Sequence, residues 1–495
     1  MPTIFRNVSW GGLSAGIRLT LGMGNLGLAI SLMGSSQYGH VALIVALGAT
    51  VLAVGNSFFT IAASAILNAR PAGAATPEIR SSIAGVWTFA TLSALIVIAG
   101  GVVFDSALVQ AWVYWGTDRP YVDMMAAVVQ LITGATACQL LTACNAALVE
   151  SNTRFDLAAR IQLIGPGVVF PALLVMKLGA WGATPFDYAL LVFIAAAIEL
   201  LIAFAVRARS FPGSGFHFSI EGIRRLPGML RGAGLLQGAN LANIFVDPLN
   251  KYLLNRFVGA ATVTHYDAGM KVAMGLQGLF NGAFRTFLQL ASKGADEISG
   301  SLLKVVRLAW VPAILLHGAA AASLALIGHF WLTDVIVATL PFFGALLPTS
   351  LGIIFITPLY LVLIGRGDLQ FIFRMHALLA AVNLVASLLL IPRFGLIGAA
   401  AGLAVATSYN VYAAFHRYGT HVGPIDGLFV VLRAMRAKFL IAAGVAVAAS
   451  ISALILSSVS TGYLILELAL LVITIILAVR EPIMSYAMQR MRPVY

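Results

Sequence analysis

Four cationic side chains interrupt long apolar runs of this sequence: Arg18, Lys251, Lys271 and Arg285. A charge at that depth in an apolar run is costly, so each needs a partner, a water-filled cavity or a function. Ammonium and guanidinium groups attract anions, and arginine binds phosphate or carboxylate through paired N–H donors. If these side chains share a wet cavity, the sequence predicts a binding site for an anionic group.

Amide side chains follow the same helical faces as these cations. The polar residues of run 232–256 fall within an arc of about 100°, and those of run 264–290 within about 80°. A third polar face lies in run 10–33. The candidate binding residues are Arg18, Asn25, Asn240, Asn243, Asn250, Lys251, Lys271, Gln277, Asn281 and Arg285. We predict that these faces line one cavity, in which the amides hydrogen-bond hydroxyl groups.

Two of the lysines have an acidic residue four positions earlier, which leaves a second interpretation open. Asp247 and Lys251 form one i,i+4 pair, and Asp267 and Lys271 form another. Such pairs can be internal ion pairs that tie helices together. That interpretation does not extend to Arg18 and Arg285, which have no acidic neighbour at helical spacing.

Several residues are candidates for gating or ion coupling. Asp247 precedes Pro248 in the middle of an apolar run, and a proline there removes one backbone hydrogen bond and kinks the helix. Glu199 and Glu467 are further acidic residues within apolar runs. A carboxylate of this kind can carry H⁺ or Na⁺, although Glu199 can equally pair with Arg160.

The sequence offers no catalytic or metal site. Cys138 and Cys144 lie six residues apart, on different faces of one helix. The outward loops hold no paired carboxylates, and no Walker A glycine loop occurs, so ATP hydrolysis by this chain is excluded. We therefore expect no enzyme, no metal and no organic cofactor.

The elements that carry these residues must be membrane-spanning helices. The chain has 495 residues, of which 60% are hydrophobic and 10% are charged, and its mean hydropathy is +0.96. A soluble protein carries roughly 25% charged residues, so we predict an all-α polytopic membrane protein. About fourteen apolar runs reach spanning length: 10–33, 40–67, 82–104, 124–149, 158–178, 186–206, 232–256, 264–290, 303–325, 341–363, 371–391, 396–416, 438–457 and 462–479.

The basic residues fix the expected orientation. Of the 30 lysines and arginines, 20 fall in one alternating set of loops, and only Arg119, Lys177, Arg256 and Arg393 fall in the other. By the positive-inside rule, both termini are cytoplasmic. The net charge of +12 is therefore a topology signal, and a nucleic-acid partner is excluded.

A repeated turn divides the chain into two halves. The segments 177–183 (KLGAWGA) and 393–399 (RFGLIGA) share one pattern, and each lies at an outward turn. Two parallel six-helix halves with a site between them are a transporter architecture. The expected domains are a first half (1–206), a basic connector (207–231), a second half (232–416), a second connector (417–437), and an extra helix pair with a cytoplasmic tail (438–495).

Three motifs resemble those of a known family. They are 32–39 (LMGSSQYG), 257–268 (FVGAATVTHYDA) and 391–400 (IPRFGLIGAA). All three are similar to signatures of the polysaccharide flippases, which belong to the multidrug/oligosaccharidyl-lipid/polysaccharide exporter (MOP) superfamily. The motifs of the lipid II flippase branch are not found in the first two spans.

The resemblance implies a flippase that moves an oligosaccharide repeat unit linked to undecaprenyl pyrophosphate across the bacterial inner membrane. Its partners would be this glycan substrate, membrane lipids and other polysaccharide assembly proteins. One alternative is an ion-coupled multidrug exporter of the same superfamily, although such exporters favour acidic cavities. The other is a membrane polysaccharide polymerase or glycosyltransferase, which would need acidic groups on a large outward loop.

Overall fold

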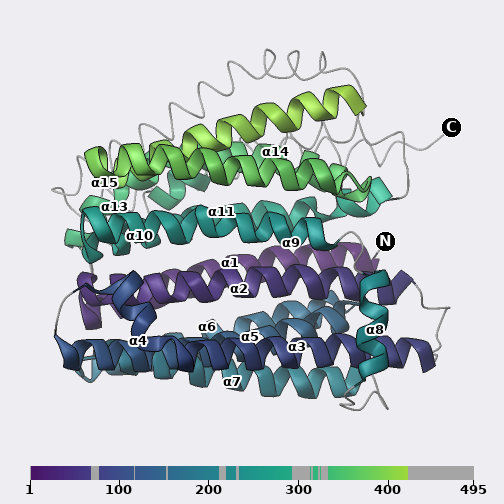
Figure 1. Cartoon of the computed structure of the whole chain (residues 1–495), viewed down its shortest axis with the longest axis horizontal. Coiled ribbons are helices and arrows are strands. Elements are labelled where there is room, and N and C mark those ends of the chain that lie inside the picture. The colour runs from purple at the N-terminus through teal and green to yellow at the C-terminus, as the bar shows by residue number, and fades with distance from the viewer. Residues whose placement is uncertain are drawn as a thin grey trace. The chain divides into compact units, whose positions relative to one another are not determined.

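Helices are the only regular elements in the part of the chain that the structure describes (Figure 1). The structure is a computed structural model. It describes residues 2–68, 77–115, 118–151, 154–210, 219–229, 233–292, 313, 316–321, 324 and 333–421. A helix satisfies its backbone hydrogen bonds within its own segment, as an apolar run inside lipid requires. The all-α architecture expected from the sequence is confirmed.

Seven helices in the described residues are long and apolar enough to cross a membrane. They are Leu13–Met33, Ser35–Asn56, Arg80–Val103, Arg119–Glu150, Asp156–Leu178, Pro185–Ser210 and Leu369–Ala414. A pair bent by 44°, Thr339–Ala345 with Thr349–Ile364, would make an eighth span. The chain is thus a multi-pass membrane protein. Runs 438–457 and 462–479 lie outside the described residues, and the total of fourteen spans stays a prediction.

The elements of the first part of the chain follow the predicted runs within about five residues, except that α1 begins eight residues earlier than its run. They are α1 (Pro2–Met33), α2 (Ser35–Asn68), α3 (Pro77–Val103), α4 (Asp105–Leu108), the π-helix η1 (Val109–Val113), α5 (Arg119–Ser151), α6 (Phe155–Leu178) and α7 (Pro185–Ser210). Gly34, with φ +84°, ends α1 and allows α2 to start in a new direction.

The later helices contain two breaks. They are α8 (Ile220–Met229), α9 (Ala233–Ala242), the 3₁₀ helix η2 (Asn243–Phe245), α10 (Asp247–Phe257), α11 (Ala260–Ser292), α13 (Thr333–Ala345), α14 (Leu347–Gly365) and α15 (Leu369–His421). The kink predicted at Pro248 is a full break, because this proline lies in the first turn of a separate helix, α10. In α15, Gly395 takes non-helical angles (φ 54°, ψ −125°), where the sequence predicts an outward turn.

The chain divides into two compact units. One comprises Met1–Asp267 with Leu369–Gly395, and the other comprises Ala268–Asp368 with Leu396–Tyr495. The first unit contains α1 to α10 and the opening turns of α11 and α15. In the second unit, Phe342 of α13 covers Gly269 of α11. The domain boundaries expected from the sequence stay a prediction.

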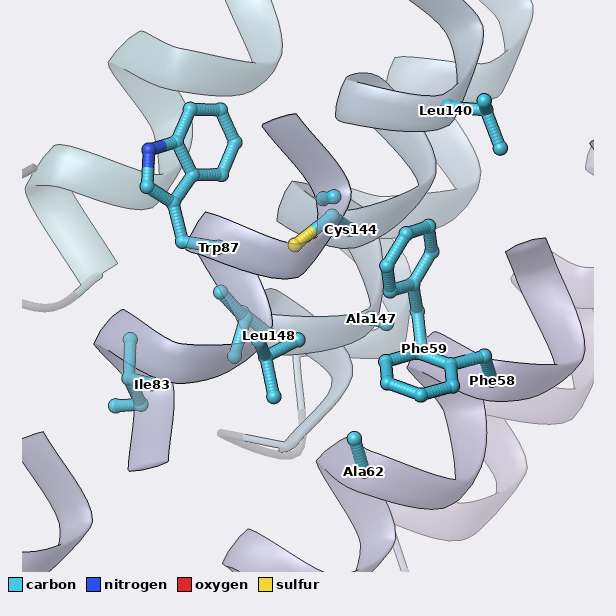
Figure 2. Close-up of a cluster of buried hydrophobic side chains, with 11 residues drawn as sticks. Phe58, Phe59, Ala62, Ile83, Trp87, Leu140, Cys144, Ala147 and Leu148 are labelled. Atoms are coloured by element: carbon cyan, nitrogen blue, oxygen red, sulfur yellow. The ribbon is translucent and has the colours of Figure 1, made fainter. Parts of the chain in front are cut away.

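A cluster of buried apolar side chains holds α2, α3 and α5 together in the first unit (Figure 2). Its members include Phe58, Phe59, Trp87, Cys144 and Leu148. Because lipid is as apolar as these side chains, the cluster stabilises the helix contacts through close packing and not through the removal of apolar surface from water. The cluster therefore fixes the positions of three helices against which α1, α7 and α10 are set.

The basic connector 207–231 begins in the last turn of α7, and its segment Ile220–Met229 forms helix α8, which packs against α3. Gly85 and Gly222 meet backbone to backbone, so a side chain at either position would displace α8. The Ser219 N–H donates to Thr88 Oγ1 at 3.1 Å, which ties the start of α8 to α3. The connector is therefore docked on the first unit at this point.

Candidate functional site

The polar stripe of run 232–256 is divided among three elements. Asn240 lies in α9, Asn243 in η2, and Asp247, Asn250 and Lys251 in α10. The single helical arc expected from the sequence required an unbroken helix, and the break at Pro248 removes that condition. The side chain of Asn243 lies outside the described residues. The three α10 residues are brought together with residues from α2, α11 and α15.

Lys251 is the centre of a buried ion cluster. Its ammonium lies 2.7 Å from Asp267 Oδ1 and 2.9 Å from Asp247 Oδ2, and the residue is 5% exposed. The Tyr38 hydroxyl donates to Asp267 Oδ2 at 2.9 Å. Two carboxylates thus face one ammonium, so this cluster has an excess of one negative charge. The i,i+4 pair of Asp247 and Lys251 exists, and Asp267 joins it from the neighbouring helix.

A layer of amides lies beside the ion cluster and covers the helix break. Asn383 of α15 donates to the Phe245 carbonyl at 3.0 Å and to Asn250 Oδ1 at 3.2 Å. Asn250 in turn donates to the Tyr266 hydroxyl at 3.4 Å, and both residues are fully buried. Buried backbone carbonyls need a donor where a helix is interrupted. Asn383 supplies that donor, and Ser387 donates to its side-chain oxygen at 3.5 Å.

Three of these residues are absent from the set of sites predicted from the sequence. Tyr38 and Tyr266 belong to the motifs that carry the family resemblance, but neither was assigned a role. Asn383 is a lone amide in the apolar run 371–391. A single amide in such a run was the available signal, since a buried amide in lipid needs partners.

The predicted polar face of α1 contacts α6. Arg18 Nη1 donates to Gln162 Oε1 at 2.7 Å, and Asn25 Nδ2 donates to the Pro166 carbonyl at 3.3 Å. Arg18 is exposed at the surface of the unit, whereas Asn25 is half-buried. The hydrogen bond to Gln162 holds the guanidinium against α6.

Glu199 of α7 lies close to the same part of α6. Its carboxylate covers Gly165, where an added Cβ would lie 2.6 Å from Oε2. Glu199 is 9% exposed and interacts electrostatically with Arg18. The sequence suggested Arg160 as a partner of this carboxylate, which stays a prediction, and the Arg18 charge of α1 also acts on it. Arg18, Gln162 and Glu199 therefore form one polar cluster of α1, α6 and α7.

The predicted residues of α11 belong to the second unit. Lys271 is half-buried, and Gln277 Nε2 donates to Ser350 Oγ at 3.1 Å. Asn281 and Arg285 lie on the same unbroken helix, and their side chains lie outside the described residues. Glu467 also lies outside the described residues. No group of three His, Cys, Asp or Glu side chains in the described part could hold a metal ion.

Comparison with known proteins identifies relatives by fold. No protein-family model and no curated protein sequence matches the chain. Among solved structures, the chain is similar to a lipid II flippase MurJ in an inward closed conformation, with a TM-score of 0.65 and 12% identity over 94% of this chain and 98% of that chain. It is also similar to an inward-facing multidrug resistance MATE transporter of the MOP superfamily, with a TM-score of 0.59 and 13% identity over 84% and 98%. These likenesses show that the chain shares the fold of these two transporters, as the resemblance led us to expect.

Proposed function

We propose that this chain is a transporter that flips an anionic lipid-linked oligosaccharide across the bacterial inner membrane by alternating access. The lipid carrier is undecaprenyl pyrophosphate, and both termini lie in the cytoplasm. The fold supports this proposal, since a lipid II flippase shares it over nearly the whole chain. The absence of a nucleotide-binding loop supports coupling to an ion gradient or to consumption of the product.

Arg18 is the observation that carries the proposal. It lies inside a span of α1, is exposed, hydrogen-bonds Gln162 and interacts electrostatically with Glu199. A guanidinium in a low-dielectric surround attracts phosphate strongly, and its planar fork fits two phosphate oxygens. Arg18 therefore binds the pyrophosphate of the cargo, and Asn25 on the same face of α1 lies near enough to bind hydroxyl groups. Lys271, Asn281 and Arg285 of α11 stay the further cationic and amide candidates that the sequence suggests for binding the cargo.

Replacement of Arg18 by glutamine tests this proposal. Arg18→Gln keeps a polar N–H donor but removes the charge, so export of polymer should fall by roughly tenfold or more, the loss expected for one charge-assisted hydrogen bond. Arg285→Gln should have the same effect. Arg119→Gln is the matched control, because Arg119 is exposed at the start of α5. Normal export in both cavity variants, at normal protein levels in the membrane, would refute the proposal.

The coupling ion is assigned to the Lys251 cluster. Its excess carboxylate lies at the helix break, where the Asp247 side chain is 29% exposed. A carboxylate beside an interrupted helix is a suitable site for H⁺ or Na⁺. Asp247 is therefore the coupling residue and Pro248 the hinge, with Glu199 and Glu467 as further acidic candidates.

The same excess of negative charge favours a second candidate function, an ion-coupled multidrug exporter. A shared fold with a multidrug resistance MATE transporter supports it as well. Such an exporter moves cationic compounds, which the Lys251 cluster would attract and Arg18 would repel. Arg18→Gln distinguishes the two functions, because it should lower polymer export under the first and raise efflux of a cationic dye under the second.

A further inference from the structure

Two glycine–tyrosine segments that are far apart in the sequence start two neighbouring helices. Gly34 (φ +84°) precedes α2, and Gly259 (φ +122°) precedes α11. Side chains other than glycine rarely adopt these angles, so each glycine fixes where its helix begins. The first turns of α2 and of α11 belong to the same compact unit.

The two helix starts are in direct backbone contact. Gly39 of α2 lies against the Ala260 carbonyl of α11, so closely that a Cβ on this glycine would clash with that carbonyl. Small residues permit such an approach between membrane helices, and the contact then excludes water and lipid. Any opening between these helices must first separate this contact.

Side chains join the same two helices at successive turns. Thr264 Oγ1 donates to the Ser35 carbonyl at 2.5 Å, and Tyr38 Oη donates to Asp267 Oδ2 at 2.9 Å. The second hydrogen bond lies three residues after the first on each helix, which is about one turn, so the two bonds are successive rungs. Thr264, Tyr38 and Asp267 are all buried. The two rungs and the glycine contact therefore form one ladder between α2 and α11.

The inner rung is connected to the ion cluster. Asp267 accepts from Tyr38 with one oxygen and from Lys251 with the other. When α2 moves away, Asp267 loses a neutral donor while it keeps the ammonium. The Asp267 carboxylate thus remains paired with Lys251 throughout. The separation costs the free energy of one hydrogen bond and leaves no buried charge without a partner.

We infer that this ladder is the outward latch of the transport cycle, which closes the cavity on the extracytoplasmic side. The inference rests on the proposed function, since alternating access requires an outward closure, and on the proposed orientation, which puts the starts of α2 and α11 on the outward side. Cargo leaves outward only after Tyr38 and Asp267 separate. The cluster of Lys251, Asp247 and Asp267 links this separation to the coupling site.

Labelling of a cysteine beside the ladder tests the latch in whole cells. Cys138 and Cys144 are first replaced (Cys138→Ser, Cys144→Ala), and Val263→Cys then reports access from outside to a membrane-impermeant maleimide. Val263 is 0% exposed and makes neither rung of the ladder, so labelling of the reporter alone should be slow. Addition of Tyr38→Phe removes only the hydroxyl of the second rung, and labelling should accelerate by roughly tenfold. Tyr409→Phe is the control, since Tyr409 is 38% exposed on α15, and it should leave the rate unchanged.

A second variant guards against misfolding of the first. Gly39→Ala pushes α2 away from the Ala260 carbonyl and should also accelerate labelling; it decides alone if Tyr38→Phe does not reach the membrane. Labelling of both variants at the control rate would overturn the latch. Labelling needs no cargo, so the two proposals can fail separately. If labelling accelerates as expected but export does not depend on Arg18, only the proposed cargo is refuted. If export depends on Arg18 but labelling does not accelerate, only the latch is refuted.

Discussion

At the scale of single residues, the burial of Lys251 depends on its two carboxylates. An isolated ammonium in a low-dielectric surround would lose its proton or unfold the site, and Asp247 and Asp267 prevent this by contacts of 2.9 and 2.7 Å. The reverse dependence also holds, because both carboxylates need the ammonium to offset their mutual repulsion. The three residues therefore stabilise the fold as a set.

Removal of the ammonium should reveal this dependence. Lys251→Met leaves two carboxylates close together without a cation, and we expect a loss of stability of about 3–5 kcal/mol, measured by thermal unfolding in detergent. Lys251→Met combined with Asp267→Asn should recover part of that loss. Lys177→Met is the control, because Lys177 is exposed at the end of α6. Equal stability of Lys251→Met and this control would show that the cluster does not stabilise the fold.

At the scale of elements, the break between α9 and α10 puts Asp247 at the start of a separate helix, whereas a continuous helix would put it in the middle. Pro248 cannot supply the N–H that would join the two helices, so the carbonyls before it need other donors. Asn383 provides one of these donors from α15. A side chain of α15 therefore stabilises the break beside Asp247, the candidate coupling residue.

Removal of the Asn383 amide should loosen this break. Asn383→Leu removes the donor to the Phe245 carbonyl and the donor to Asn250 Oδ1, at a cost of about 1–3 kcal/mol. Hydrogen–deuterium exchange of the segment around η2 should become faster. Gln370→Leu serves as the control, since this exposed amide lies on the same helix, α15. If exchange around η2 is as slow as in that control, Asn383 does not hold the break.

Much of the helical architecture could be predicted from apolar runs and turn glycines. Run 158–178 became Phe155–Leu178, and the glycine motif at Gly395 became the turn inside α15. Long apolar runs predict helices reliably because lipid leaves the backbone no other donors and acceptors. The break at Pro248 was less predictable, since a proline in a span produces either a bend or a new helix, and distant partners decide which.

The contacts of the site were harder to predict than its residue types. Lys251 was expected to pair at i,i+4, and Asp267 joined it from the next helix, 16 residues away. Arg18 was expected to have no acidic neighbour at helical spacing, and Glu199 reaches the same part of α6 from a different helix, α7. Helical spacing describes neighbours on one helix only, whereas these partners meet through the packing of different helices.

At the scale of the whole molecule, the fold is shared with transporters at 12–13% identity. Such a likeness at low identity fits a fold specified by apolar pattern, glycine contacts and helix breaks, features that many sequences satisfy. The cargo is specified by far fewer residues. Among the described residues, Arg18 is an exposed cation inside a span, and the proposed anionic cargo depends on its charge.

Translocation in proteoliposomes tests this central claim most directly. The purified chain is reconstituted into vesicles that contain a fluorescent oligosaccharide linked to undecaprenyl pyrophosphate, and the rate at which the label becomes accessible on the other leaflet is measured. We predict that the wild-type chain accelerates this step over protein-free vesicles, and that Arg18→Gln slows it by roughly tenfold or more. Equal rates for Arg18→Gln and wild type, or equal transport of an uncharged analogue, would contradict the account.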